Sequence, residues 1–226
     1  MKNKIILLIT AVFSLATSVN AQDAGASFGL RAGFNMQNIN GKDMDGDKLT
    51  MDLVPRFNAG IVGEIPVAPD FYFQPGLFFA TKGAKSKDQF LGQNMSVEYN
   101  ISYLELPLSF LYKPTLGAGK FFLGFGPYVS YGLGGKAKFD VAGVKTEDDI
   151  VFDNEYLGLN PFDWKHFRHL DYGGNLFFGY ELNSGLSLQL NTQMGFAKIN
   201  SENTLYPNNK SEFRNTGFGL SLGYNF

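Results

Sequence analysis

The chain has 226 residues, of which 19 are basic and 21 acidic, so its formal net charge is −2. This balance offers no basic surface for nucleic acid. Because there is no cysteine, disulfide bonds and thiolate metal sites are excluded. Phenylalanine (23 residues) and glycine (27 residues) are both abundant, a combination that few soluble domains show.

The first 21 residues are predicted to be a secretory signal peptide. Two lysines precede an apolar run over residues 5–16, and small and polar residues then lead to a cleavage site that ends at Ala21. An N-terminal membrane anchor is the alternative, but the run is shorter than the roughly 20 residues that a spanning helix needs. We therefore expect residues 1–21 to be removed and residues 22–226 to form one exported domain.

Eight segments of the remaining chain alternate strictly between apolar and small or polar residues. They cover residues 27–35, 56–65, 71–82, 97–112, 121–133, 171–182, 186–197 and 217–226. In the first segment, for example, Phe28, Leu30 and Phe34 alternate with glycines and Arg31. A period of two predicts strands with one apolar face and one polar face. Eight such strands of about 10 residues predict an antiparallel, up-and-down transmembrane β-barrel, which is an all-β fold.

The connections between these segments alternate in length without exception. Long connections (36–55, 83–96, 134–170 and 198–212) alternate along the chain with short ones (66–70, 113–120 and 183–185). Outer-membrane barrels have this arrangement, with tight periplasmic turns and longer extracellular loops. A soluble eight-stranded barrel gives no reason for it, so we expect an integral protein of the cell outer membrane.

The polar face of the predicted strands carries few charges, and we expect it to line the lumen. An eight-stranded barrel is only wide enough to be filled by side chains, and glycine makes room for the long polar ones. Arg31, Glu64, Glu105 and Glu181 lie on this face. Because an unpaired buried charge is costly, we expect a structural charge cluster in which the three carboxylates share Arg31. A narrow polar path for ions is the alternative.

Three stretches resemble the PorT-type outer-membrane β-barrel family of Gram-negative bacteria, whose members are porin-like barrels. The stretch 103–114, YLELPLSFLYKP, is similar to the Tyr-Leu-Glu-Ile-Pro-Leu hallmark of the family. The stretches 124–136 and 167–199 resemble its Gly-Pro-Tyr strand and its Asp-x-Gly strand. The matching residues are Tyr103, Leu104, Glu105, Pro107, Gly126, Pro127, Tyr128, Asp171 and Gly173.

The resemblance implies the barrel fold but no settled activity, because the family is defined by its fold. One member is implicated in the type IX secretion apparatus, which implies a possible envelope protein as partner. The end of the chain, with Tyr224 and Phe226, resembles the signal that the barrel-insertion machinery reads. We expect Phe226 to face lipid and to close the barrel beside the first strand.

Two short motifs are candidates for metal or phosphate chemistry. The segment 43–52 spaces three carboxylates alternately, as a calcium loop does, but it lacks the glycine at the sixth position. Val54 stands where the bidentate glutamate would be, so a solvated acidic loop is the better interpretation. The stretch 132–136, GLGGK, has neither the full spacing of a phosphate loop nor a following helix. We therefore expect no metal and no cofactor.

The only histidines, His166 and His169, lie in the longest connection beside Asp163 and Trp164. A metal pair or a catalytic base is one interpretation, and small barrel enzymes that move acyl chains have their sites in such loops. An aromatic segment at the membrane interface is the other interpretation, because Trp and Tyr favour that zone. No serine is aligned with a histidine and a carboxylate, so we expect the protein not to be an enzyme.

The sequence as a whole predicts an outer-membrane barrel with four extracellular loops and a filled lumen. Its expected role is structural contact at the cell surface or a minor pore, in contact with outer-membrane lipid and lipopolysaccharide. One alternative is a partner-binding component of a secretion or envelope-assembly system of the type IX kind. The other alternative is an outer-membrane lipid-modifying enzyme that uses the connection 134–170.

Overall fold

The computed structural model of the chain describes residues 25–226, apart from 91–92, 159–164 and 207. The predicted signal peptide, Asp163 and Trp164 lie outside the described residues. The part of the chain that is described contains no helix that is long and apolar enough to cross a membrane.

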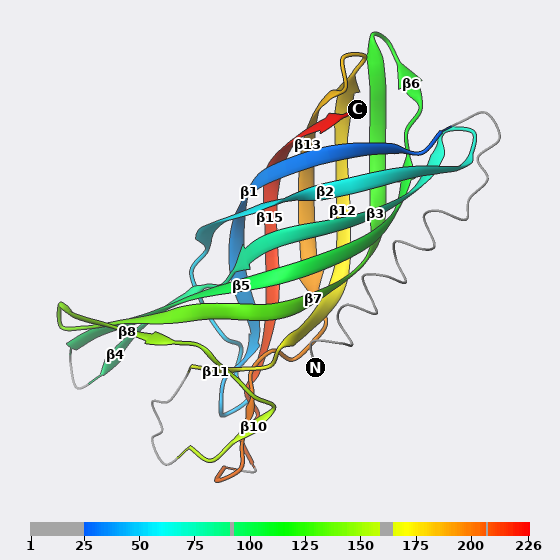
Figure 1. Cartoon of the computed structure of the whole chain (residues 1–226). Coiled ribbons are helices and arrows are strands. Elements are labelled where there is room, and N and C mark those ends of the chain that lie inside the picture. Colours follow the sequence, from blue (N-terminus) through cyan, green and yellow to red (C-terminus); the bar gives the residue numbers. More distant parts are fainter. Residues whose placement is uncertain (1–24, 91–92, 159–164, 207) are drawn as a thin grey trace.

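Eight long strands form a closed barrel (Figure 1). They are β1 (Ser27–Lys42), β2 (Val54–Ala68), β3 (Phe71–Lys82), β5 (Gln93–Tyr112), β7 (Gly119–Val141), β12 (Leu170–Leu182), β13 (Leu186–Gly195) and β15 (Glu212–Asn225). Each of them pairs antiparallel with the next, and β15 pairs with β1 to close the sheet. The eight-stranded, antiparallel, up-and-down barrel predicted from the alternating residues is therefore confirmed.

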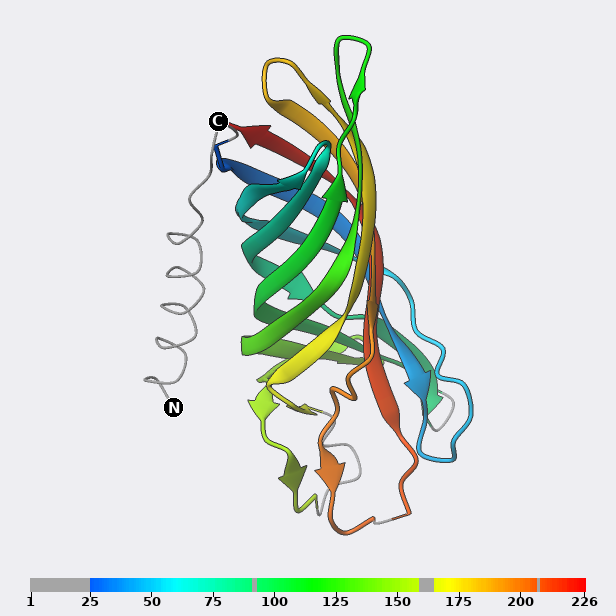
Figure 2. The same ribbon diagram turned by 90° about the vertical axis from the view of Figure 1, so that its right-hand side faces the viewer.

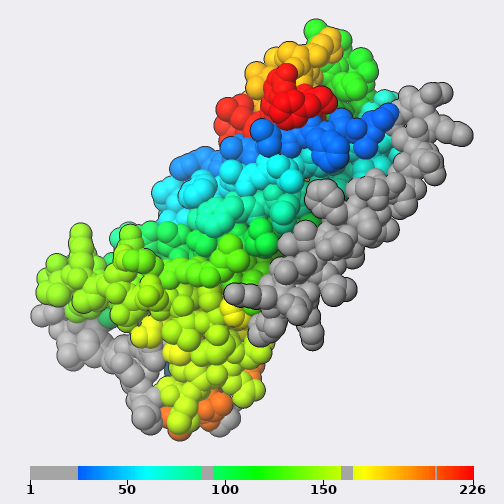
Figure 3. Space-filling view, viewed as in Figure 1, coloured from blue at the N-terminus to red at the C-terminus, as the bar shows by residue number. Residues whose placement is uncertain are grey.

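The two ends of the barrel differ as the connection lengths predict. Both described termini and the short turns β2–β3, β5–β7 and β12–β13 lie at one end, which we name the turn end (Figures 1 and 2). The four long connections lie at the opposite end, the loop end. Figure 3 shows the residues of the connection after β7 gathered at this end of the molecule.

Several strands continue past the predicted boundaries, and the longest of these extensions are at the loop end. β1 ends at Lys42 rather than at residue 35, and β7 ends at Val141 rather than at residue 133. The long connections also hold short strands that alternation did not reveal. These are β4 (Lys85–Phe90), β8 (Val144–Asp149), β9 (Val151–Phe152), β10 (Glu155–Tyr156), β11 (His166–Phe167) and β14 (Glu202–Asn203), while β6 (Thr115–Leu116) lies in a turn.

The outer surface of the barrel is a belt of exposed apolar side chains. It includes Phe28, Leu30, Phe34, Phe57, Ile61, Phe110, Phe125, Leu176, Phe178, Leu188, Leu190, Phe218, Leu220, Leu222 and Tyr224. Phe28 is 63% exposed although it lies within a paired strand region. In a closed barrel every backbone group of the sheet can be paired, so such a belt is compatible with lipid.

A cluster of buried apolar side chains, which we name the cap core, lies at the loop end. Its members are Ile39, Ala84, Val97, Tyr99, Ile101, Tyr103, Ala137, Ile150, Phe167, Ala197 and Ile199. The rings of Tyr99 and Phe167 meet edge to face, with centroids 5.2 Å apart. The extended parts of β1 and β7, residues 97–103 of β5 and the long connections contribute to this core, which the alternation of residue types does not predict.

Candidate functional site: the charged lumen

The buried charges of the lumen form two separate clusters, each centred on a lysine. The cluster nearer the loop end, the Lys82 cluster, consists of Lys82, Tyr103, Glu105, Tyr128, Ser130, Asp171, Gln193 and Asn215. The cluster nearer the turn end, the Lys113 cluster, consists of Arg31, Glu64, Gln74, Lys113, Glu181 and Asn225. The sequence predicts one cluster around Arg31, and that prediction of the layout is wrong.

Lys82 forms ion pairs with two carboxylates, one on the adjacent strand β5 and one on β12. Its Nζ lies 2.7 Å from Oε2 of Glu105 and 3.0 Å from Oδ2 of Asp171. The side chains of Lys82 and Asp171 are essentially inaccessible to solvent. Two carboxylates on one ammonium group leave a net charge of −1, so further donors are needed to stabilise the second carboxylate.

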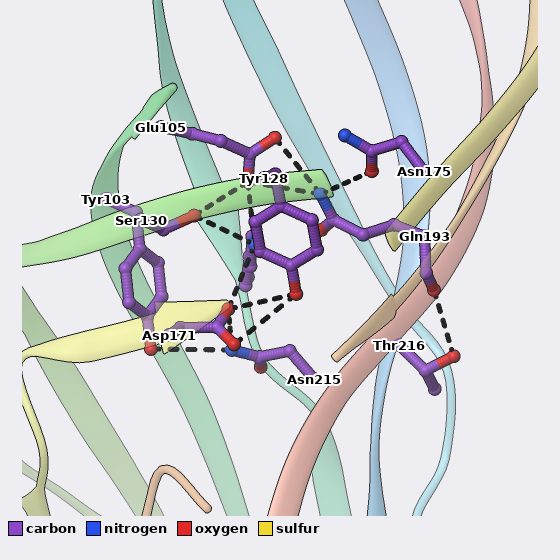
Figure 4. Close-up of polar contacts among 10 residues, drawn as sticks. Tyr103, Glu105, Tyr128, Ser130, Asp171, Asn175, Gln193, Asn215 and Thr216 are labelled. Carbon is purple, nitrogen blue, oxygen red and sulfur yellow. Dashed lines mark hydrogen bonds and ion pairs between the residues drawn. The ribbon is translucent and has the colours of Figure 1, made fainter. Parts of the chain in front are cut away.

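Neutral donors supply this stabilisation. Glu105 accepts hydrogen bonds from Gln193 Nε2 (3.0 and 3.1 Å) and from Ser130 Oγ (2.9 Å). Asp171 accepts from Asn215 Nδ2 at 3.0 Å and from the hydroxyl of Tyr128 at 3.3 Å. Figure 4 shows Glu105, Tyr128, Asp171, Gln193 and Asn215 directed toward one another from different strands.

Two tyrosine rings complete the surroundings of Lys82. Its Nζ lies 4.1 Å from the ring centroid of Tyr128 and 5.3 Å from that of Tyr103. At these distances the ring faces attract the ammonium charge, most strongly where water is excluded. The cluster therefore ties β3, β5, β7, β12, β13 and β15 together across the lumen.

The polar residues of the stretches that resemble the PorT-type family meet in this one place. Tyr103, Glu105, Tyr128 and Asp171 come from three strands and all belong to the Lys82 cluster. The motif glycines serve close packing, because a Cβ atom at Gly173 would lie 2.1 Å from the backbone oxygen of Met194.

The remaining motif residues occupy the barrel wall. A Cβ atom at Gly126 would lie 2.1 Å from the backbone oxygen of Leu108. Pro107 lines the lumen, Leu104 is half-buried, and Pro127 is exposed. These residues form part of the barrel strands that carry the charged side chains.

Lys113 is the centre of the second cluster. Its Nζ lies 2.7 Å from Oε2 of Glu64 and 2.7 Å from Oε2 of Glu181. Gln74 and Asn225 donate to Glu64 at 3.1 and 3.2 Å. Asn225 also donates to Glu181. Glu64 is buried, whereas Glu181 is half-buried, so this cluster lies close to the mouth of the turn end.

Arg31 is buried in the lumen but is not the shared counter-charge that the sequence predicts. Its Nη1 donates to Oε1 of Gln74 at 3.3 Å, and it forms no ion pair with any described residue. Lys113 forms ion pairs with both Glu64 and Glu181, and Lys82 forms one with Glu105. The carboxylates pair with the lysines because both lysines project into the lumen at the levels of the carboxylates.

Sequence periodicity contained a signal for both lysines. Lys82 continues the inward series of Gln74 and Gly76 on β3, and Lys113 continues the inward series of Glu105 and Ser109 just after β5. The alternation places Lys82 on the polar face without giving it a partner, and the predicted strand end puts Lys113 in a turn. Had the alternation been continued one residue past the predicted end of the strand, it would have placed Lys113 on the inner face.

The other candidate motifs take part in local structure. Oδ1 of Asp43 accepts from the backbone nitrogens of Asp45, Gly46 and Asp47 at 2.9–3.0 Å, as in an ordinary polar turn. Among the described residues, no group of three or more His, Cys, Asp or Glu is placed to hold a metal ion. The stretch 132–136 lies within β7.

The two histidines have different surroundings. His169 is stacked between Tyr131 and Phe152, with ring centroids 4.6 and 4.5 Å away. Nδ1 of His166 lies 2.8 Å from Oδ2 of Asp153, and its ring is stacked on Tyr156 at 4.1 Å. Both histidines therefore contribute to the packing of the longest connection.

A serine does approach the pair of His166 and Asp153, but its hydroxyl is directed elsewhere. Ser201 Oγ donates to the backbone oxygen of Asp153 at 2.7 Å. A catalytic serine would instead direct its hydroxyl to the base. This contact gives no support to the lipid-modifying enzyme that was one alternative.

The end of the chain closes the barrel. The backbone nitrogen of Phe226 donates to the backbone oxygen of Phe28 at 2.8 Å, so the last residue lies beside β1. The Phe226 side chain is 76% exposed and meets the ring of Tyr224 edge to face at 5.1 Å. Both side chains lie on the outer, apolar surface of the barrel.

Comparison with known proteins gives one match by sequence family. The family model described as an outer membrane protein beta-barrel domain matches residues 20–201. Comparison with curated protein sequences finds no match.

Three solved structures are similar over most of the chain. The attachment invasion locus protein Ail of Yersinia pestis is 10% identical, with 90% of this chain and 100% of that chain covered and a TM-score of 0.39. Neisserial surface protein A is 13% identical, with the same coverage and a TM-score of 0.44. OprG of Pseudomonas aeruginosa is 16% identical, with 89% and 96% covered and a TM-score of 0.40.

Proposed function

Because the chain belongs to the outer membrane protein beta-barrel family, we propose that it is a non-conducting barrel whose loop end makes contacts at the cell surface. The observation that carries the proposal is the filled lumen. From the loop end to the turn end, the lumen is filled by the cap core, then the Lys82 cluster and then the Lys113 cluster. A minor pore would need a continuous polar path through these levels, so surface contact is the role that the geometry supports best.

The described residues of the long connections offer a polar surface for such contact. A groove of about 440 Å³ lies between the connection after β7 and the connection after β13. It is lined by Glu155, Lys198, Ser201, Glu202, Asn203, Thr204, Tyr206, Asn209 and Ser211. Hydrogen-bonding side chains with one aromatic ring suit a hydroxyl-rich saccharide, such as the sugars of lipopolysaccharide.

The charge of the groove is set by a small ion-pair network. Lys198 and Arg168 lower the pKa of the Glu202 carboxyl, which lies 3.4 Å from Lys198 Nζ and 2.9 Å from Arg168 Nη2. Glu202 is therefore a carboxylate at neutral pH, and Glu202 and Glu155 together balance the charges of Lys198 and Arg168. This balance favours a neutral saccharide over a strongly anionic ligand.

Two measurements test the proposal. In planar bilayers the purified protein should give no single-channel steps, and regular steps would favour the minor pore instead. A photo-crosslinker at Asn209 in the groove should attach to lipopolysaccharide on whole cells, whereas one at Leu116 at the turn end should not. Equal lipopolysaccharide labelling from both positions would contradict the assignment of the loop end to the cell surface.

The second candidate function is partner binding within a secretion or envelope assembly. It is favoured by a sheet that projects from the loop end, in which β4, β5, β7 and β8 are neighbours (Figure 1). Across this sheet Lys85, Glu98, Lys138 and Glu147 lie in register with alternating charge. Charged edge strands resist non-specific pairing, so a partner would have to complement this pattern.

Membership in the PorT-type family is part of this second candidate. It is supported by the motif residues Tyr103, Glu105, Tyr128 and Asp171, which share one buried network. Co-purification in mild detergent should recover the same envelope protein with the natural chain but not with a Lys138→Glu variant. If the natural chain and the Lys138→Glu variant both recovered lipopolysaccharide and no protein, partner binding would be contradicted and surface contact would remain.

A further inference from the structure

Lys82 lies in a position from which its amine can react as well as form ion pairs. Its Nζ lies 2.7 Å from Oε2 of Glu105 and 3.0 Å from Oδ2 of Asp171, and the side chains of Lys82 and Asp171 are essentially inaccessible to solvent. An oxygen at 3.0 Å leaves the carboxyl carbon of Asp171 close to the separation of about 3–3.5 Å from which bonds form. One amine and two carboxyl groups at these distances are the two reactants and the base that amide formation requires.

The charge balance of these three groups favours the reactive, neutral forms. As ion pairs the three side chains carry three charges, of which one negative charge is in excess. Transfer of a proton from Lys82 to one carboxylate leaves a neutral amine, a neutral acid and a single carboxylate. Because a buried charge is costly even when it is paired, this transfer removes two charges from a place that disfavours them.

Hydrogen bonds decide which of the two carboxylates takes the proton. Glu105 accepts from Gln193 Nε2 at 3.0 and 3.1 Å and from Ser130 Oγ at 2.9 Å, and these donors favour its charged form. The hydrogen bonds to Asp171 are longer, at 3.0 and 3.3 Å, and its side chain has no contact with solvent. Glu105 therefore stays a carboxylate and acts as the base, while Asp171 becomes the acid that the amine attacks.

The surroundings of Asp171 suit the transition state of such an attack. Attack on its carboxyl carbon moves negative charge onto the oxygens, and the Tyr128 hydroxyl lies 3.3 Å from Oδ1 while Asn215 Nδ2 lies 3.0 Å from Oδ2. Donors that already point to the developing charge stabilise it most where water is excluded. The ring centroids of Tyr128 and Tyr103 lie 4.1 and 5.3 Å from Lys82 Nζ, so the reacting atoms are shielded from solvent.

We propose that Lys82 and Asp171 condense to an intramolecular amide bond, with Glu105 as the catalytic base. Nζ of the neutral amine attacks Cγ of the protonated Asp171, and a new N–C bond forms. Glu105 takes one proton from Nζ and gives it to the departing hydroxyl, so the C–O bond breaks and one water molecule leaves. The step needs no oxidant or cofactor, and Glu105 ends unchanged. The inference goes beyond the proposed surface role and does not depend on it.

The bond joins strands that are not neighbours. Lys82 lies on β3 and Asp171 on β12, which the sheet separates by β5 and β7, and 89 residues separate them in the sequence. A crosslink that closes so long a loop stabilises a protein by restricting its unfolded chain, as a disulfide does. The chain has no cysteine, so an amide bond supplies a crosslink that disulfide chemistry cannot supply here.

The Lys113 cluster is an internal comparison with the same kinds of group. Lys113 Nζ lies 2.7 Å from both Glu64 and Glu181, so the distances are as short as those at Lys82. Glu181, however, is half-buried near the mouth of the turn end, and the ring centroid of Tyr72 is 5.9 Å from Nζ. Solvent at this carboxylate keeps it charged and opposes the loss of water. We therefore expect no amide bond at Lys113.

Intact mass spectrometry of the mature protein, purified from the outer membrane, tests the proposal. The measured mass should be lower by one water molecule than the mass calculated from the sequence. After proteolysis, fragmentation should identify a branched peptide that joins Lys82 to Asp171. The full calculated mass would overturn the proposal, and a branch from Lys82 to Glu105 would overturn the assignment of the acid and the base.

Three variants locate the reaction. Lys82→Arg keeps the positive charge but replaces the amine by a weakly nucleophilic guanidinium, and Glu105→Gln removes the base, so both should have their full calculated masses. Lys113→Arg is the matched control and should still lose one water molecule. Loss of water in Lys82→Arg, or the full mass in Lys113→Arg, would contradict the assigned site.

Because a variant can fail to fold, the natural chain provides a second test. Protein produced without residues 1–21 and dissolved in urea should have its full calculated mass. It should lose one water molecule after it folds in detergent micelles, since folding brings Lys82 to Asp171. An unchanged mass in protein whose folding is shown by heat-modifiable migration on a gel would overturn the proposal.

Discussion

Lys82 and Asp171 lie 89 residues apart in the sequence, yet Nζ of Lys82 is 3.0 Å from Oδ2 of Asp171 inside the barrel. They belong to β3 and β12, which are separated in the sheet by β5 and β7. The contact therefore spans two intervening strands across the lumen and depends on the curvature of the sheet. Because both side chains are fully buried, the contact also makes the stability of the barrel depend on a charge.

Replacement of Lys82 by methionine should destabilise the barrel by about 3–5 kcal/mol, because it leaves Glu105 and Asp171 buried without a cation. The measurement is the free energy of unfolding in urea, in detergent micelles or vesicles. Lys87→Met is the matched control. Its ion pair with Asp52 is exposed, so the change should stay within about 0.5 kcal/mol. Equal losses in the two variants would contradict the role of the Lys82 cluster.

A double-mutant cycle should show that Glu64 is coupled to Lys113 and hardly to Arg31. We expect a coupling energy of about 1–3 kcal/mol for Glu64→Gln with Lys113→Met, because their atoms are 2.7 Å apart. For Glu64→Gln with Arg31→Met the value should be smaller, since Gln74 stands between the two groups. A larger coupling energy with Arg31 would support the arrangement expected from the sequence, in which the carboxylates share Arg31 as their counter-charge.

The orientation of the barrel can be tested with single cysteines, because the natural chain has none. A cysteine in place of Val144, an exposed residue at the loop end, should react with an impermeant thiol reagent on whole cells. A cysteine in place of Ser184, in the turn between β12 and β13, should react only after the outer membrane is opened. The reverse pattern would mean that the loop end faces the periplasm.

Replacement of Phe226 by serine should reduce the amount of folded protein in the outer membrane. Phe226 is the exposed aromatic at the end of β15, where the barrel-insertion machinery is expected to bind. The measurement is the fraction of heat-modifiable, folded protein on a gel without boiling. Leu116→Ser changes another exposed apolar residue at the turn end and should leave this fraction unchanged. A similar loss in both variants would show a general effect of lost apolar surface.

Local alternation of residue types by itself determined the barrel. The period of two in segments such as 186–197 assigns each side chain to one face, and the connection lengths assign each loop to one end. Leu188 and Leu190 lie on the outer face and Gln189 and Gln193 on the inner face, as the alternation predicts. These properties depend only on near neighbours in the chain.

The tertiary structure alone decided which charges meet and what closes the loop end. Arg31, Lys82 and Lys113 all face inward, but their partners depend on the relative height of strands that are far apart in the sequence. That height follows from the stagger of the closed sheet, which local alternation does not contain. The cap core arises in the same way, because residues such as Ile39, Val97 and Phe167 become neighbours only after the barrel has closed.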